Sequence, residues 1–488
     1  MLDYRYQITA YNDTLAAGAG RPRFFVRTYG CQMNSRDSEK LSALLLQLGY
    51  NQAETQDDAD LVLYNTCCVR ESAEDRIFGN LGRLKHAKQD NPGLIIAVCG
   101  CMTQQAHIAE QIRKSHKYIN LVFGTGNRHR LPQLLWQAIE TGKQVIDITE
   151  DDELPELTDI PVTTREYPHK AGVNIMYGCD NFCSYCIVPY VRGREKSRAV
   201  VDILQEVRDL AADGVKEIML LGQNVNSYRY KWDSAPNPAA MREMNPLSDS
   251  SASLQELALR DSRACGFTDL LRQVCSVDGI KRVRFMTSHP KDVSDELIAA
   301  IADLSNVCKS IHLPVQSGST RVLADMNRKY SKDEYLNLVA RLRAAVPGIA
   351  ISTDIIVGYP GETEEDFLET LDVVRQVRFA TAFTFLYSKR SGTPAAERTD
   401  IIPRKVIQER YDRLVAEVSP ILLEINESKI GSVFDTMVEE ITPDGYKGRL
   451  DDHSLVHFNG RADLVQGDIV PVQIESARTF YLTGVCPQ

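Results

Sequence analysis

The chain has 488 residues, of which 43% are apolar and 25% are charged, and its formal net charge is −10. This length exceeds one ordinary hydrophobic core and predicts about three domains, while the composition is that of a soluble globular protein. The acidic balance argues against a broad nucleic-acid-binding face, so any RNA contact would depend on local basic patches.

Neither a membrane span nor a secretion signal is expected. The sequence has no run of about 20 apolar residues, and its first 20 residues lack a charged start followed by an apolar block. We therefore expect a cytoplasmic protein without a membrane partner. In that compartment thiols stay reduced, and clustered cysteines are metal ligands more often than disulfides.

The first predicted domain covers residues 24–139 and follows an N-terminal extension at 1–23. It alternates helical patterns such as DSEKLSALLLQLG with the apolar strand candidates RFFVRTY, DLVLYNT and LIIAVCG. This alternation predicts an open α/β sheet with mostly parallel strands. No G-x-G-x-x-G follows the first strand, so a dinucleotide site has no support.

The second predicted domain covers residues 166–415, after a linker at 140–165 that is acidic and interrupted by Pro155 and Pro161. Helical stretches at 200–213, 292–304, 332–346 and 363–377 separate six strand candidates: VNIM, EIMLLG, VRFMTS, SIHLPV, IAISTDIIVG and AFTFLYS. Repeated βα units predict a partial (β/α)6 barrel with its chemistry at the C-terminal strand ends. Residues 229–264 interrupt the series and are predicted to be a surface insertion.

One helix of this series has clear signals at its start. Thr363 is a predicted N-cap with Asp366 three residues further on, and Phe367, Leu371 and Val374 form the expected buried stripe. At 423–488 the pattern changes to short strands separated by Gly, Pro and Asp turns. This predicts a small all-β barrel, so the chain as a whole is a multidomain α/β protein.

Three cysteines, Cys179, Cys183 and Cys186, lie in the loop after the first barrel strand with the spacing Cys-x3-Cys-x2-Cys. Cubane iron–sulfur clusters are usually held by four thiolates, so three would leave one iron open. The alternative is a zinc site, which normally needs a fourth ligand from a second pair. No second pair follows with zinc-ribbon spacing, and the pattern favours a cluster.

Three more cysteines, Cys31, Cys67 and Cys101, each come just after a predicted strand of the first domain. Ligands of open parallel sheets gather outside the carboxyl ends of the strands, so these three could converge there. The alternative is three buried thiols, because free cysteine is commonly buried. Their position past the strands favours a second cluster with three cysteine ligands.

These motifs resemble a known family. GCDNFCSYC resembles the signature of the radical S-adenosylmethionine (SAM) superfamily. Together with TYGCQMN, NTCCVRESAEDR and GCMTQQ, and with a terminal module similar to a TRAM domain, it resembles the methylthiotransferase family from residue 24 to the end. NTC-x-VRE-x-AE and CIVPYVRGREKSR resemble most the branch that modifies tRNA.

The resemblance implies two 4Fe–4S clusters, one that binds SAM at its open iron and one auxiliary cluster on Cys31, Cys67 and Cys101. It implies insertion of a methylthio group at C2 of N6-isopentenyladenosine next to the anticodon. One SAM would supply the methyl group and another the 5′-deoxyadenosyl radical. The implied partners are a tRNA anticodon stem-loop, an electron donor protein and a sulfur source.

Two other functions stay open at this point. A sibling enzyme could act on N6-threonylcarbamoyladenosine in tRNA or on a ribosomal-protein aspartate. A non-enzymatic iron–sulfur protein could bind RNA or carry electrons, although polar residues at so many barrel strand ends argue against it.

The family motif places its ligand directly after Asn-Thr, which is Cys67 here. Its neighbour Cys68 would then be a bystander and the first substitute if Cys67 were removed. Cys99 lies within a strand and is predicted to be a core residue. The remaining cysteines show no metal spacing and are predicted to be structural: Cys265, Cys275, Cys308 and Cys486.

Candidate SAM-binding residues lie at the ends of the barrel strands, where polar side chains tend to be catalytic. They are Gln223, Asn224, Ser288, His289, Gln316 and Asp354, with Tyr185 expected against adenine. The alternative for each is an ordinary cap or a core hydrogen bond.

Candidate RNA contacts come from two basic groups. Arg192, Arg194, Lys196 and Arg198 follow the cluster loop, and Lys447, Arg449 and Arg461 lie in the terminal module. A basic run is more often a solvated face, but one beside a predicted active site suits phosphate contact. A base in a folded stem-loop would have to be flipped out to reach the barrel.

Overall fold

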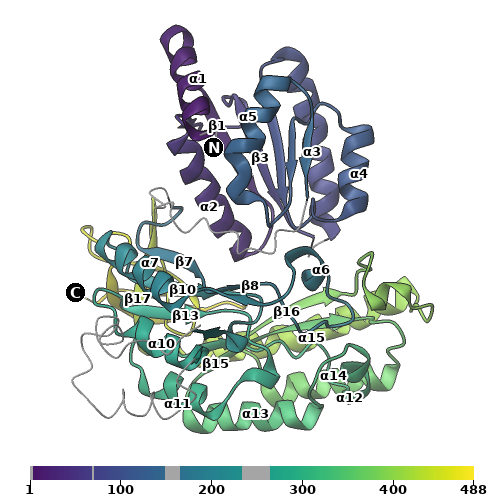
Figure 1. Cartoon of the computed structure of the whole chain (residues 1–488). Helices are drawn as coiled ribbons and strands as arrows, with labels where there is room; N and C mark the ends of the chain where they lie inside the picture. The colour runs from purple at the N-terminus through teal and green to yellow at the C-terminus, as the bar shows by residue number, and fades with distance from the viewer. Residues whose placement is uncertain (1–3, 69–70, 149–164, 233–263, 488) are drawn as a thin grey trace. The chain divides into compact units, whose positions relative to one another are not determined.

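The computed structural model describes residues 4–68, 71–148, 165–232 and 264–487 (Figure 1). The chain divides into two compact units. The first contains Met1–Glu166, Tyr177–Asp180 and Ile187–Lys196, and the second contains Tyr167–Met176, Asn181–Cys186 and Ser197–Gln488.

The first unit is built on a six-stranded parallel sheet with the order β2-β1-β3-β4-β5-β6. Its strands are β1 (Arg23–Thr28), β2 (Asn51–Gln52), β3 (Leu61–Thr66), β4 (Ile95–Gly100), β5 (Leu121–Phe123) and β6 (Val145–Asp147). The three predicted strands are confirmed as β1, β3 and β4. The other three have only two or three residues, too few to show a periodic pattern.

Helices cover both faces of this sheet, and each face has its own apolar cluster. One cluster joins the sheet to α1 (Tyr4–Ala19), α2 (Gln32–Gln47) and α5 (Leu131–Thr141). The other joins it to α3 (Glu71–Asp90) and α4 (Ala106–Ser115), which lie on the opposite side in Figure 1. The open α/β fold predicted for this domain is therefore confirmed.

Both predicted boundaries of this domain need correction. The extension at 1–23 is helical over α1, where Ile8 is fully buried and Tyr11 packs edge-to-face on Trp136 of α5 at 6.3 Å. The linker predicted at 140–165 begins too early, because α5 continues to Thr141 and β6 completes the sheet. The Pro-containing part, 149–164, lies outside the described residues.

The second unit contains the six parallel strands predicted for the barrel series. They form two sheets, β13-β10-β7 and β14-β15-β16, with a parallel bridge between Val283 and Val307 at the junction. The strands are β7 (Lys170–Asn174), β10 (Glu217–Leu221), β13 (Arg282–Phe285), β14 (Ser310–His312), β15 (Ala350–Val357) and β16 (Thr381–Leu386).

One large apolar cluster joins these strands to the helices between and after them. The helices are α7 (Val200–Ala212), α10 (Phe267–Cys275), α11 (Asp295–Asp303), α12 (Thr320–Asp325), α13 (Lys332–Ala345), α14 (Glu364–Val377) and α15 (Arg404–Glu427). The predicted insertion starts and ends in an antiparallel pair, β11 (Arg229–Lys231) with β12 (Ala264–Gly266). Residues 233–263 between them lie outside the described residues.

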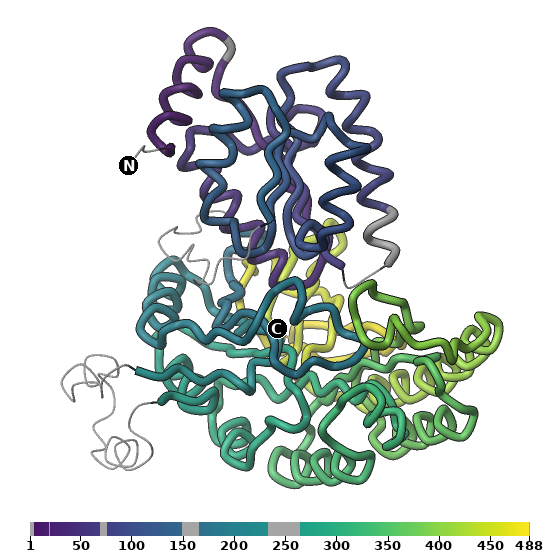
Figure 2. Tube along the Cα trace, turned by 45° about the vertical axis from the view of Figure 1, so that its right-hand side comes forward, coloured from purple at the N-terminus to yellow at the C-terminus, as the bar shows by residue number. Residues whose placement is uncertain are grey.

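The chain ends in a closed five-stranded barrel, yellow in Figure 2, with the order β17-β18-β19-β21-β20. Its strands are β17 (Val433–Thr442), β18 (Gly445–Arg449), β19 (Leu455–Asn459), β20 (Ile469–Ala477) and β21 (Leu482–Val485). The predicted all-β module is confirmed, but its predicted start at 423 falls inside α15. No helix in the described ranges is long and apolar enough to cross a membrane.

Candidate active site

Three neighbouring parallel strands of the first unit lead into the three separated cysteines. Cys31 follows β1, Cys67 follows β3 and Cys101 follows β4, and β3 lies between the other two strands. Because parallel strands end at the same edge, all three segments reach one edge of the sheet.

Cys31 is the N-cap residue of α2, which begins five residues earlier than the helical pattern starting at Asp37 predicts. Its backbone is extended (φ −87°, ψ 178°), and its Sγ lies 3.3 Å from Asn34 Oδ1. Cys31 is exposed, whereas Cys67 and Cys101 are buried.

Asn34 and Asn65 fix the start of α2 to the end of β3. Asn34 Nδ2 donates to Asn65 Oδ1 and to the Thr66 carbonyl, at 3.1 and 3.0 Å. Asn65 Nδ2 donates in return to the Asn34 carbonyl at 2.8 Å. These side-chain bonds join the backbone beside Cys31 to the backbone beside Cys67, and so they fix the positions of the two cysteines.

Arg192 is directed at Cys101. Arg192 belongs to the short helix α6 (Val188–Arg192), and its side chain is 3% exposed. Its Nε lies 3.1 Å from Cys101 Sγ, and its Nη2 lies 3.3 Å from Asn34 Oδ1 and 3.4 Å from Asp37 Oδ2. The prediction that Arg192 contacts RNA phosphate is wrong, because the guanidinium is buried among these acceptors.

Cys68 also contacts Cys101. The Cys68 thiol donates to the Cys101 sulfur and, with Arg192, holds the pKa of Cys101 below its ordinary value against the effect of burial. The same bond and burial raise the pKa of Cys68. Cys68 is therefore more than the predicted bystander. Cys99 is fully buried in β4, as predicted, and burial raises its pKa.

The Cys-x3-Cys-x2-Cys loop is divided between the two units. In the first unit, the Cys179 N–H donates to the Gly193 carbonyl at 3.1 Å. In the second unit, the Cys186 N–H donates to the Cys183 carbonyl at 2.9 Å, which closes a turn. The buried Arg328 lies 3.3 Å, at Nη1, from Cys183 Sγ. Sequence reasoning missed Arg328, which stands in an ordinary polar stretch.

The donor sets suit iron–sulfur clusters in their chemistry. Within the described part of the chain, no three Cys, His, Asp or Glu side chains are gathered tightly enough to hold a single metal ion. A cubane cluster is larger than one ion and takes thiolates, whose negative charge nearby cations stabilise. A buried arginine beside Cys101 and another beside Cys183 provide such cations.

The candidate SAM residues fall into two groups. Asn224 and His289 have structural roles, because Asn224 donates to Asp292 at 2.7 Å and accepts from the His289 N–H at 3.1 Å. The His289 ring accepts from the Lys291 N–H, and burial lowers the pKa of His289 to about 2. For these two residues the structure supports the alternative, a satisfied turn.

The other candidates have different surroundings. The Ser288 hydroxyl is buried and has no hydrogen-bond partner among the described residues. Gln316 has a positive φ of 68°. Its backbone forms a parallel bridge to β15. Asp354 Oδ2 lies 3.4 Å from His312 Nε2. Gln223 is half-buried, and Tyr185 packs against an apolar cluster that contains Met326.

The predicted RNA contacts have different surroundings. Arg198 is buried and bonds to Glu206 at 2.7 Å and to the Asn174 carbonyl at 2.6 Å, so its prediction as a phosphate contact is wrong. Arg194 is 70% exposed beside Asp180, and Lys196 is half-buried. In the terminal barrel the three basic residues each lie beside an acidic one: Lys447 with Glu440, Arg449 with Glu439 and Arg461 with Asp463.

Sequence reasoning also missed an aromatic cavity of about 310 Å³ in the second unit. Strands β13–β16 and the terminal barrel line it, and its walls include Phe383, Phe480, Tyr481, Arg284 and Arg449. Phe480 is 77% exposed. The cavity is therefore lined by aromatic faces and cationic side chains, the groups that hold unstacked bases.

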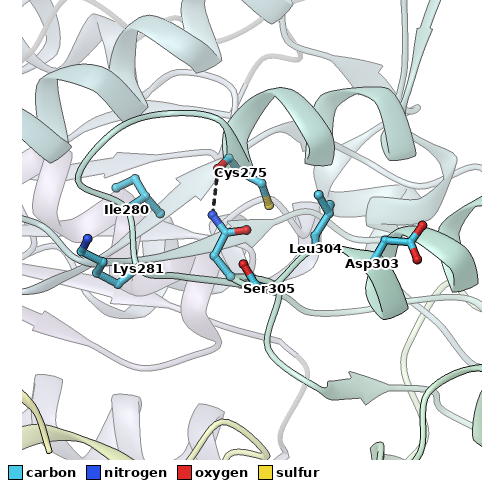
Figure 3. A pocket seen from close by; sticks show the side chains of 7 residues that line it. Cys275, Ile280, Lys281, Asp303, Leu304 and Ser305 are labelled. Atoms are coloured by element: carbon cyan, nitrogen blue, oxygen red, sulfur yellow. Dashed lines mark hydrogen bonds between the residues drawn. The ribbon is translucent and has the colours of Figure 1, made fainter. Parts of the chain in front are cut away.

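A second depression, of about 480 Å³, is shallow and polar (Figure 3). It lies where α10 and α11 end, and Asn306 Nδ2 donates there to the Cys275 carbonyl at 2.8 Å. Its lining includes none of the site residues predicted above. Burial raises the pKa of the Cys275 thiol to about 12, which fits the structural role predicted for this cysteine.

Comparison with known proteins places the chain in a family. A family model described as uncharacterized protein family UPF0004 matches residues 23–124, and one described as the radical SAM superfamily matches residues 173–374. A tRNA-2-methylthio-N(6)-dimethylallyladenosine synthase from Clostridioides difficile (strain 630) is 45% identical over 486 residues, which cover 99% of this chain and 95% of the relative. The chain belongs to the tRNA-2-methylthio-N(6)-dimethylallyladenosine synthase family.

Another synthase of this family, from Lachnoclostridium phytofermentans, is 47% identical over 95% of this chain and 96% of the relative. The solved structure of the radical S-adenosylmethionine methyltransferase TsrM from Kitasatospora setae, with tryptophan substrate and a SAM analogue bound, matches with a TM-score of 0.51. It is 12% identical and covers 82% of this chain and 89% of that chain, so it shows a shared fold. The resemblance to radical SAM methylthiotransferases is thereby confirmed.

Proposed function

We propose that this chain is a tRNA methylthiotransferase that inserts a methylthio group at C2 of N6-isopentenyladenosine next to the anticodon. The observation that carries the proposal is the placement of Cys31, Cys67 and Cys101 after three adjacent strands, in a chain that aligns over almost its full length with synthases of this activity. One SAM would serve as methyl donor and another as radical source.

Two sets of three cysteines would hold the two clusters of the proposed enzyme. Cys179, Cys183 and Cys186 would hold the cluster that supplies the electron for SAM cleavage, and Cys31, Cys67 and Cys101 the auxiliary cluster. Arg192 and Arg328 donate to one sulfur of each set and so fix its orientation. An electron donor protein and a sulfur source are required as partners.

The chain's own side chains would bind SAM and the base. Among the SAM candidates, Ser288 has an unpaired buried hydroxyl, which is costly unless a ligand uses it. Gln223, Gln316, Asp354 and Tyr185 remain candidates beside it. The aromatic cavity at Phe383 and Phe480 is a candidate contact for an unstacked base of the RNA outside the reaction centre.

The terminal barrel is proposed to be a TRAM domain that contacts the anticodon stem-loop in the cytoplasm. Its exposed Arg461, together with Lys447 and Arg449, could reach phosphates if the acidic partners exchange for RNA. Arg194, exposed beside Asp180, stays a candidate of the same kind, with Lys196 next to it.

The test is mass spectrometry of tRNA nucleosides from cells that lack a synthase of this family and receive this chain. We expect 2-methylthio-N6-isopentenyladenosine to appear with the unchanged chain. It should be absent with Cys101→Ala and unchanged with Cys486→Ala, a buried cysteine of the terminal barrel. A methylthio group on N6-threonylcarbamoyladenosine instead would support the sibling enzyme, and no modified nucleoside would support a binding protein.

A further inference from the structure

Arg192 brings a positive charge into a buried polar group of the first unit. Asp37 lies between two arginines, with its carboxylate in contact with Arg128 and 3.4 Å from Arg192. The side chains of Arg128, Asp37 and Arg192 are all 5% exposed or less. Two cations thus face one carboxylate, which leaves one positive charge without an anion among these three residues.

Isolated buried charges are strongly unfavourable, so an anion is expected beside Arg192. The sulfur of Cys101 lies 3.1 Å from Nε, nearer than the Asp37 carboxylate lies to Nη2. Arg128 alone would neutralise the Asp37 carboxylate, so Arg192 is not needed for that purpose. The shorter contact of Arg192 is with the sulfur of Cys101, which indicates that its positive charge acts on this cysteine.

We propose that Arg192 is a positioning residue for the auxiliary cluster: it donates to the Cys101 sulfur and raises the reduction potential of that cluster. This inference rests on the proposed function only in assigning a cluster to Cys31, Cys67 and Cys101. A hydrogen bond and a fixed positive charge at a ligand sulfur stabilise the more negative, reduced state of an iron–sulfur cluster. Asp37 and Asn34 hold the guanidinium in place.

The experiment measures the potential of the auxiliary cluster alone. The full chain carries Cys179→Ala, Cys183→Ala and Cys186→Ala, is reconstituted with iron and sulfide without oxygen, and is titrated with mediators while the reduced cluster is followed by electron paramagnetic resonance. Adding R192Q should lower the equilibrium constant for reduction of the cluster at least tenfold, which lowers the reduction potential by about 59 mV for one electron. R192K, which keeps the charge, should recover part of the shift.

R194Q is the matched control. Arg194 lies two residues further along the same segment, is 70% exposed and pairs with Asp180, so its removal should leave the potential unchanged. Retention of the cluster by R192K but not by R192Q would also support the proposal, provided that both variants melt at the temperature of the parent chain. Equal potentials in R192Q and the parent, or equal loss of cluster in both variants, would overturn it.

The outcome is separable from that of the proposed function. If the parent chain binds no cluster at all, both proposals fail together. If the parent binds a cluster and the unchanged chain modifies tRNA, but R192Q leaves the potential unmoved, the proposal for Arg192 fails and the function stands.

Discussion

The sulfur ligands of both candidate clusters have buried arginine partners, Arg192 and Arg328. A basic run in a sequence predicts an exposed patch because most lysines and arginines are solvated, and this reasoning placed Arg192 and Arg198 on an RNA surface. The structure buries both, because Asp37 and Glu206 are brought to them by folding. Whether a charged side chain is buried depends on the acidic partners that the fold brings to it. The basic motif alone does not show these partners.

Gly178 controls the position of Cys179. Its φ is +72°, and a Cβ there would lie 2.0 Å from the Arg194 carbonyl oxygen. Because the obstacle is backbone, no side-chain rotation relieves it, so Gly178→Ala should displace Cys179. In a chain with Cys31, Cys67 and Cys101 changed to Ala, we expect G178A to lose most of the iron of the remaining site, measured after anaerobic reconstitution.

Gly142 provides the control for this substitution. It also has a positive φ, +64°, but a Cβ there meets nothing within 4 Å. G142A should therefore cost about 1–2 kcal/mol of stability from backbone strain and leave the iron content unchanged. Full iron binding by G178A would show that the loop tolerates the displacement.

Elements with a clear period or a marked apolar run were predictable from the sequence, and three short strands of the first sheet were not. The six parallel strands of the second unit's βα series and α14, with its Thr363 N-cap and Asp366, were all predicted. Strands β2, β5 and β6 were missed because they add only two or three residues to a sheet that β1, β3 and β4 define. The start of α2 was missed because Gln32–Arg36 has only one apolar residue, Met33, and because its N-cap Cys31 is not a usual capping residue.

The capping box of α14 predicts a pH-dependent stability. Burial alone would raise the pKa of Asp366, but bonds from Arg321, Ser319 and Thr363 outweigh it and hold the pKa below the ordinary value. The carboxylate therefore stabilises the fold above about pH 4, and this contribution disappears as pH falls through the lowered pKa. D366N should cost about 1–2 kcal/mol at pH 7 and progressively less below pH 4.

Thermal unfolding of the cluster-free chain across this pH range measures the effect. Glu369→Gln is the matched control, because Glu369 is an exposed carboxylate on the same helix. E369Q should unfold like the unchanged chain at every pH. A difference between D366N and the unchanged chain that stays constant down to pH 3 would contradict the assignment to the ionised carboxylate.

At the scale of the whole chain, the sequence predicted three kinds of fold in the right order but not how the last two are joined. The strand patterns of the terminal module showed a separate all-β fold, and the structure places it in the same compact unit as the six-stranded series. Two of the joining contacts are buried side chains on β13. Arg282 donates to the Arg449 and Asp435 carbonyls, at 2.8 and 2.7 Å. Such contacts leave no periodic signal.

Arg284 is another of these joining contacts. Its side chain is 2% exposed, and it donates to the Leu450 and Asp451 carbonyls at 2.8 Å and to buried Glu217 at 3.1 Å. Arg284→Met would fill similar space but leave the Glu217 carboxylate buried without its cation, at a cost of about 3–5 kcal/mol. We expect a lower unfolding temperature and faster hydrogen exchange in β18 and β19, because their turn at Leu450 loses its donor. Lys281→Met, three residues away and exposed, should change neither quantity. Equal exchange in the two variants would mean that the Arg284 bonds do not hold β18 and β19 in place.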